Sequence, residues 1–155
     1  MSTNQPVGQL SDPSQGLTID AYAGPVAVQA VAATMELFKP TKNISTFAPD
    51  YKQLVTDIFE SRALIWVVSK DLKIVGVAVT SLVVMPYGIV LQFRYGRSII
   101  DGIADEVVDY IIRTAKSQGR VDFVELEGRA GFSRKFFPKF GKIQHVSSIY
   151  RIPVE

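Results

Sequence analysis

The feature that most constrains the fold is a set of three apolar segments in the middle of the chain. Residues 64–69, 74–84 and 89–95 are rich in valine, isoleucine and leucine, and residues typical of turns separate them. This pattern predicts an antiparallel meander. Its second strand is apolar on both faces from Val75 to Val84, which is expected of a central strand that is covered on both sides.

Helical patterns precede the meander and follow a short predicted strand at 17–22. Gly24 and Pro25 open the first helix, whose apolar residues recur at helical spacing until Pro40 ends it. The second helix begins near Asp50 and carries an apolar stripe along one side. We therefore expect one strand and two helices before the meander.

The chain after the meander predicts a crossover connection. Ser98, with Asp101 three residues later, forms a capping-box pattern that opens a long helix ending at Gly119, and a strand at 121–126 follows. A helix that joins neighbouring strands in this way is the crossover of a right-handed βαβ unit, so the sheet is mixed. A short helix and a final strand complete the chain, at 132–137 and 143–152. The predicted fold class is α/β (α+β), a mixed, mainly antiparallel sheet flanked by helices in the order β-α-α-β-β-β-α-β-α-β.

Composition limits the number of domains and the possible chemistry. The chain has 155 residues, of which 47% are hydrophobic, as expected of one globular domain. Residues 1–16 hold few large apolar side chains, so we expect a flexible N-terminal arm that orders on a partner, followed by a single domain at 17–155. The chain has no cysteine and one histidine, His145, which leaves no expected metal site.

Charge and hydropathy patterns favour a soluble protein. The net charge of +2 is too small for the whole surface to bind polyanions. No apolar run is long enough to span a bilayer, and the N-terminus lacks the pattern of a signal peptide. We therefore expect a cytoplasmic location.

The order of elements, together with the segment from Phe137 to Gly141 before the last strand, resembles the GNAT (Gcn5-related N-acetyltransferase) fold across residues 17–152. In that family the third meander strand ends in a bulge. A glycine-rich turn at the start of the next helix then offers backbone N–H groups to the pyrophosphate of acetyl-CoA. The resemblance implies a cofactor-binding turn made of Arg94, Tyr95, Gly96, Arg97, Ser98 and Ile99.

This turn departs from the family pattern Gln/Arg-x-x-Gly-x-Gly/Ala. Arg94 matches its first position, but Arg97 and Ile99 stand where glycine and a small residue belong. Both side chains would crowd the phosphate, so we expect that no cofactor binds. The alternative is that the positive charge of Arg97 helps to hold acetyl-CoA.

The groups that would transfer protons also depart from the family. Many of its enzymes use a tyrosine of the late helix to protonate the leaving thiolate, and the aligned residue here is Phe137, which has no proton to give. If the protein is active, Glu125 and Glu127 are the candidate general bases. The alternative for these two glutamates is a row of side chains that face solvent.

A narrower resemblance concerns two short motifs. Tyr95, Gly96 and Arg97, combined with residues 127–132 (Glu-Gly-Arg-Ala-Gly-Phe), look like GNAT-like proteins encoded in the structural-gene clusters of tailed bacteriophages. The resemblance implies a catalytically degenerate protein that binds other phage or virion proteins through its N-terminal arm, as a virion component or assembly factor. It would be located in the host cytoplasm or in the virion. The first alternative is an acetyl-CoA-dependent N-acetyltransferase.

A second alternative is a nucleic-acid-binding module. Residues 129–142 combine five lysines and arginines with four phenylalanines and contain no acidic residue. The spacing of Phe132, Phe136 and Phe140 also suits packing against the core, with the basic residues in solvent. We favour the core-packing interpretation.

Overall fold

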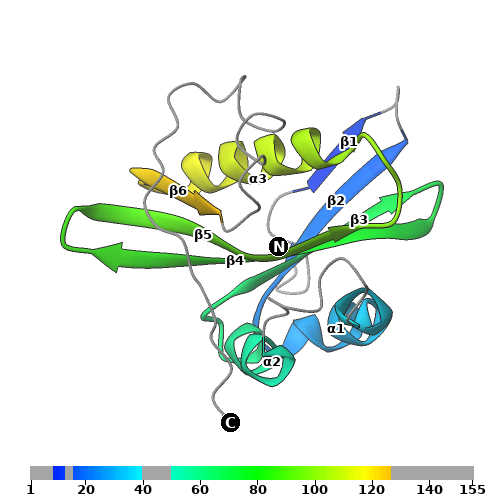
Figure 1. Cartoon of the computed structure of the whole chain (residues 1–155), viewed down its shortest axis with the longest axis horizontal. Helices are drawn as coiled ribbons and strands as arrows, with labels where there is room; N and C mark the ends of the chain where they lie inside the picture. The colour runs from blue at the N-terminus through cyan, green and yellow to red at the C-terminus, as the bar shows by residue number, and fades with distance from the viewer. Residues whose placement is uncertain (1–8, 13–15, 40–49, 127–155) are drawn as a thin grey trace, which may run out of the picture.

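The computed structural model describes residues 9–12, 16–39 and 50–126 and contains one six-stranded sheet with helices on both faces (Figure 1). The strands are β1 (Gln9–Asp12), β2 (Leu17–Tyr22), β3 (Leu64–Lys70), β4 (Lys73–Met85), β5 (Gly88–Ser98) and β6 (Phe123–Leu126). The helical segments are η1 (Gly24–Ala27), α1 (Val28–Ala33), η2 (Met35–Phe38), α2 (Tyr51–Phe59) and α3 (Ala104–Gln118).

The sheet is mixed and mainly antiparallel, which confirms the predicted fold class. Its strands lie in sequence order, and each pair from β1 to β5 is antiparallel. The β5–β6 pair is parallel, because α3 carries the chain across one face between them. In Figure 1, α3 lies on one side of the sheet, and α1 and α2 lie on the other.

Alternation along β3 explains why both faces of the sheet are covered. Ile65 and Val67 pack in the core shared with α1 and α2, whereas Trp66 and Val68 pack in the core under α3. Trp66 is an anchor of that core, as its size predicts: it is 1% exposed, and its Nε1 donates a 2.9 Å hydrogen bond to the hydroxyl of Thr80.

The second helix of the chain is capped where the sequence predicts. Asp50 precedes α2, and its Oδ1 accepts hydrogen bonds from the N–H groups of Lys52 and Gln53 at 3.0 and 3.4 Å. The apolar stripe of α2 buries Leu54 and Ile58 against the sheet. This packing fixes the position of the helix relative to β5.

The first predicted helix is divided into η1, α1 and η2. The break follows α1 at Thr34, whose buried hydroxyl donates to the carbonyl of Ala30 at 2.8 Å. A threonine hydroxyl that bonds back to the preceding turn competes with regular helix geometry. The helical periodicity of this segment was therefore a correct signal, but it did not reveal the break.

Part of the expected arm is a strand. Gln9–Asp12 pairs antiparallel with β2 from Asp20 to Leu17, although the segment has too few apolar residues to predict a strand. Residues 1–8 and 13–15 of the arm lie outside the described residues. So do the short helix and the final strand predicted at 132–137 and 143–152.

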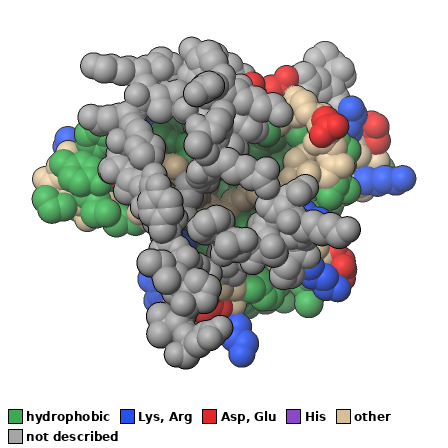
Figure 2. Space-filling model, in the orientation of Figure 1, with side chains coloured by type: hydrophobic (Ala, Val, Ile, Leu, Met, Phe, Trp, Pro, Cys, Tyr) green, Lys and Arg blue, Asp and Glu red, His purple; other side chains and the backbone are tan. Residues whose placement is uncertain are grey.

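The middle strand of the meander is central in the sheet, but it is not covered along its whole length. Val75 to Ser81 are buried, whereas Leu82 and Val84 are 58% and 82% exposed. In Figure 2 hydrophobic side chains gather at the left end of the molecule, where the tip of the β4–β5 hairpin lies in Figure 1. Cover on both faces was therefore a correct prediction only for the first part of this strand.

The connection from β5 to α3 differs from its prediction in a way that matters for the site. Ser98 is not a helix cap: it is the last residue of β5 and pairs with Gly76. Its hydroxyl donates to the carbonyl of Ile100 at 2.6 Å, and α3 begins only at Ala104. The helix ends before Gly119, as predicted.

None of the described helices is both long and apolar enough to cross a membrane.

Candidate active site

A β-bulge lies near the end of the third meander strand. In the pairing of β4 with β5, Thr80 lies opposite Phe93, and the preceding residue of β4, Val79, lies opposite Tyr95. Arg94 is therefore an extra residue in β5. Bulges bend a strand and redirect its side chains, and they occur frequently next to active sites.

The ladder between β5 and β6 reaches this bulge, as far along β6 as the structure describes the chain. The two strands pair in parallel through four residues, and the last pair within the described residues is Phe93 with Leu126. Beyond the bulge, β5 continues to Ser98 and still pairs with β4. From 94 to 98, the edge of β5 that faces away from β4 therefore has no strand partner in the part of the chain that the structure describes.

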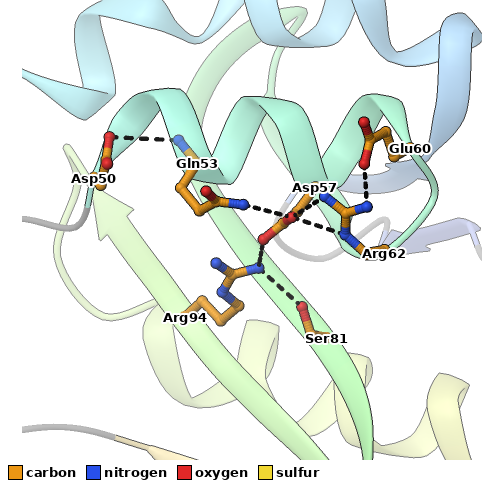
Figure 3. Close-up of polar contacts among 7 residues, drawn as sticks. All are labelled: Asp50, Gln53, Asp57, Glu60, Arg62, Ser81 and Arg94. Carbon is orange, nitrogen blue, oxygen red and sulfur yellow. Dashed lines mark hydrogen bonds and ion pairs between the residues drawn. The ribbon is translucent and has the colours of Figure 1, made fainter.

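The extra residue of the bulge does not face an open site. The guanidinium of Arg94 points towards α2, where its Nη1 lies 2.6 Å from Oδ2 of Asp57 (Figure 3). The same nitrogen donates to the hydroxyl of Ser81 in β4 at 3.3 Å. Arg94 was a predicted cofactor ligand, but the structure assigns it to an ion pair in the interior.

Asp57 is the carboxylate at the centre of this cluster. Its side chain is 10% exposed, and its Oδ1 accepts hydrogen bonds from Nε2 of Gln53 at 2.9 Å and from Nε and Nη2 of Arg62 at 3.0 and 2.8 Å. The hydrogen bonds from Arg94 and then from Arg62 lower the pKa of Asp57 from 3.8 to about 2. Asp57 is therefore ionised at neutral pH and is unsuitable as a general base.

Tyr95 and Arg97 face η2. The hydroxyl of Tyr95 donates to the carbonyl of Leu37, and burial raises the pKa of Tyr95. Nη1 of Arg97 lies 3.2 Å from the carbonyl oxygen of Leu37 and 3.1 Å from that of Lys39. These two predicted cofactor ligands instead hold the end of η2.

Gly96 lies between these two residues, so a side chain at this position would point to the opposite face of the strand. A Cβ added at Gly96 would have no atom of the described residues within 4 Å. Of the predicted turn, Gly96 is thus the residue whose placement suits close approach of a ligand to the backbone.

The turn that precedes α3 lies further along the chain than the sequence pattern suggested. The N–H of Ile99 donates to the carbonyl of Val75, and the N–H of Ile100 donates to Ser98 Oγ. The next residues, Asp101, Gly102 and Ile103, therefore carry the candidate donors. Ser98 and Ile99 were predicted ligands, but they complete the strand instead.

Gly102 gives this turn its special geometry. Its φ of +82° lies in the left-handed region, and an added Cβ would have no atom of the described residues within 4 Å. Ile103 precedes α3 and makes no side-chain cap hydrogen bond, so the positive end of the helix dipole is left without a side-chain cap. The signal that sequence reasoning missed is Gly102-Ile103-Ala104, which matches the last three positions of the family pattern.

The candidate base Glu125 lies on β6, beside β5 and close to the bulge. It pairs with Gln92, one position before Phe93 and Leu126. Its Oε2 accepts from Nε2 of Gln92 and its Oε1 from the hydroxyl of Tyr87, both at 3.2 Å. Tyr87 was not identified from the sequence. Desolvation and then the charge of Glu125 raise the pKa of Tyr87.

The second candidate base, Glu127, lies outside the described residues, as do Phe137 and the basic segment 129–142.

Comparisons with known proteins agree with this geometry. No protein-family model matches the sequence, and neither does any curated protein sequence. An aminoglycoside acetyltransferase from an uncultured soil metagenomic sample matches with a TM-score of 0.64 and 16% identity, over 89% of this chain and 97% of that chain. Ribosomal-protein-alanine N-acetyltransferase from Brucella melitensis gives a TM-score of 0.64 and 16% identity, over 90% and 99%. A predicted acetyltransferase from Clostridium acetobutylicum, solved with acetyl-CoA, gives 0.58 and 12%, over 88% and 96%.

The chain has the GNAT fold. The third meander strand contains a bulge and a turn with a glycine precedes α3, as the resemblance to that fold implies, although the turn lies further along the chain than predicted. At these levels of identity the comparisons establish the fold.

These findings correct the expectation of a catalytically degenerate virion component or assembly factor, which was wrong. The structures that match this chain are acetyltransferases. The physical argument for lost cofactor binding also fails for Arg97. It required the side chains of Arg97 and Ile99 to crowd the diphosphate, and the side chain of Arg97 points to η2 instead.

Proposed function

We propose that this protein is an acetyl-CoA-dependent N-acetyltransferase. The observation that carries the proposal is the open backbone on the GNAT fold: Gly96 on β5 and Gly102 before α3 both face space that is free of described atoms. Gly96 lies on β5 just after the bulge, and Gly102 lies in the turn just before α3. A phosphorylated carrier needs close approach to backbone amides at such a place.

The backbone of the described residues suits acetyl-CoA, whereas the charged side chains near the turn do not favour an anion. The N–H groups of 101–103 and the first turn of α3 would hold the diphosphate through backbone hydrogen bonds and the helix dipole. Asp101 lies in the turn before α3, and Asp105 and Glu106 lie in the first turn of α3, so acidic residues are close to the proposed diphosphate. Neither Arg94 nor Arg97 offsets this charge, because both point away from the turn. Among the described residues, backbone contacts are therefore the proposed source of affinity for the diphosphate.

Acetyl-CoA would supply an acetyl thioester, whose carbonyl carbon accepts the attack of an amine. In this proposal Glu125 is the general base that takes the proton of the amine. The hydrogen bonds from Tyr87 and Gln92 hold its carboxylate beside β5, two residues before the bulge residue Arg94. The carbon–nitrogen bond forms, the carbon–sulfur bond breaks, and the thiolate of coenzyme A leaves.

The experiment uses the full chain, acetyl-CoA and a panel of primary amines, and it measures cofactor binding and amine-dependent release of free thiol. At 100 times its dissociation constant, a ligand stabilises the folded state by about 2.7 kcal/mol. For a chain of this size, that corresponds to an increase in melting temperature of roughly 5–10 °C. We also expect Glu125→Gln to lower the rate by about a hundredfold or more while acetyl-CoA still binds.

A pair of matched variants tests the site itself. Gly96→Leu places a side chain in the open space on β5, and Gly119→Leu places the same side chain after the far end of α3, where an added Cβ is equally free of described atoms. We expect Gly96→Leu to abolish binding of acetyl-CoA and Gly119→Leu to retain it. The proposal fails if the wild-type chain shows no thermal shift in millimolar acetyl-CoA.

A further inference from the structure

The bulge in β5 is tied to two other elements by one side chain. Nη1 of Arg94 lies 2.6 Å from Asp57 Oδ2 on α2 and 3.3 Å from Ser81 Oγ on β4. Figure 3 shows that the guanidinium extends from β5 towards α2, between these two acceptors. Arg94 is the unpaired residue of the bulge, so these contacts replace the regular pairing that it lacks.

Asp57 offers this contact in a fixed direction. Its Oδ1 is occupied by Gln53 and Arg62, and Arg62 forms a second ion pair with Glu60. With Oδ1 held in this way, the carboxylate cannot rotate freely, and Oδ2 points at Arg94. The exposed fractions of the two side chains, 10% for Asp57 and 26% for Arg94, show that solvent screens this pair less than a surface pair.

The bulge determines which side chains of β5 face the proposed site. With Arg94 as the extra residue, Tyr95 and Arg97 face η2, and Gly96 faces the side on which an added Cβ would meet no described atom within 4 Å. A strand without the extra residue would turn every later side chain to the other face, because strand side chains alternate with a period of two. Tyr95 and Arg97 would then occupy the face on which acetyl-CoA is proposed to lie.

We propose that Asp57, acting through Arg94, is a positioning residue for acetyl-CoA. It holds the bulge in place and thereby keeps Gly96 on the open face and Arg97 away from it. Asp57 acts through Arg94 and needs no contact of its own with the cofactor. The inference rests on the proposed function, since it assumes that acetyl-CoA binds along β5.

The test compares three variants of the full chain. Asp57→Asn keeps the size of the side chain but removes its charge. Arg62→Gln is the matched control, because it removes the other guanidinium bound to Asp57 but leaves the contact with Arg94 and the hydrogen bond from Gln53 Nε2, which still holds Oδ1. Arg94→Lys keeps the positive charge with a single donor group. Acetyl-CoA affinity is measured by calorimetry at a temperature where every variant is folded, and hydrogen exchange of the amides at 93–98 is measured without ligand.

We expect Asp57→Asn to weaken acetyl-CoA binding by about tenfold or more and to speed hydrogen exchange at 93–98. Arg62→Gln should stay within about twofold of the wild type, and Arg94→Lys should lie between the two. The loss in Asp57→Asn would not be a direct charge effect, because removal of a negative charge favours an anionic ligand. If Asp57→Asn does not fold, Arg94→Lys carries the test against Arg62→Gln.

A purely structural role predicts a different result. Asp57→Asn would then lower the melting temperature, but the folded protein would bind acetyl-CoA as the wild type does, and this outcome overturns the inference while the proposed function stands. A wild-type chain that does not bind acetyl-CoA overturns both.

Discussion

Replacement of Asp57 by asparagine should cost about 2 kcal/mol of unfolding free energy at neutral pH. The magnitude follows from the pKa of Asp57, which falls from 3.8 to about 2 in the folded protein because Arg94 and Arg62 donate hydrogen bonds to the ionised carboxylate. Each pKa unit corresponds to about 1.4 kcal/mol. In either orientation of the asparagine amide, its NH₂ group would also face a guanidinium.

The pH dependence distinguishes the charge of Asp57 from its packing. A lowered pKa means that the stabilisation is complete well above pH 3.8 and is lost as the pH falls through about 2. The difference between the wild type and Asp57→Asn should therefore shrink from about 2 kcal/mol at pH 7 to about 1 kcal/mol at pH 3.

Urea denaturation of both proteins at several pH values between 7 and 3 measures this difference. Arg113→Gln, which removes an exposed ion pair with Asp109 on α3, is a suitable control and should change stability by less than about 0.5 kcal/mol. A difference that stays constant between pH 7 and pH 3 would refute the reasoning. So would a difference near zero at pH 7.

Three further substitutions test other contacts. Arg97→Ala should leave the affinity for acetyl-CoA within about twofold, because the side chain lies against η2; a gain of tenfold in calorimetry would show that it crowds the cofactor after all. Tyr95→Phe should cost about 1 kcal/mol in urea denaturation, since Leu37 O loses one donor but keeps Arg97; an unchanged midpoint would contradict this. Trp66→Phe should lower the free energy of unfolding by about 2–4 kcal/mol, because it removes buried volume and leaves the Thr80 hydroxyl without its donor. The double variant Trp66→Phe with Thr80→Val should be less destabilised than Trp66→Phe alone. Equal stability of the two variants would show that the hydrogen bond contributes nothing.

Much of the fold could be predicted from local sequence patterns. The strand at 17–22 has the bounds of β2, and the three meander segments correspond to β3, β4 and β5 within a few residues at each end. The start of the second helix near Asp50 and the end of the long helix at Gly119 were also correct. The first depends on local hydrogen bonding, because the side chain of Asp50 caps α2. The β1 strand was missed because its pairing with β2 depends on backbone contacts rather than on its own apolar residues.

The site was harder to predict because tertiary contacts move it. Ser98 and Asp101 have the spacing of a capping box, but β5 continues to Ser98 since Arg97 reaches the carbonyl groups at the end of η2 and Ile99 N–H reaches Val75. The turn therefore shifts towards Gly102, and the basic residue that was expected to obstruct it faces the other side of the strand. No pattern along the chain links Arg94 with Asp57, which lies 37 residues earlier.

Nuclear magnetic resonance of the isotopically labelled chain during titration with coenzyme A tests the central claim most directly. If the carrier binds backbone amides before α3, the largest shifts of amide resonances should occur at residues 101–104, with further shifts at Gly96. Shifts confined to residues elsewhere, or none at millimolar coenzyme A, would contradict the placement of the cofactor on this turn.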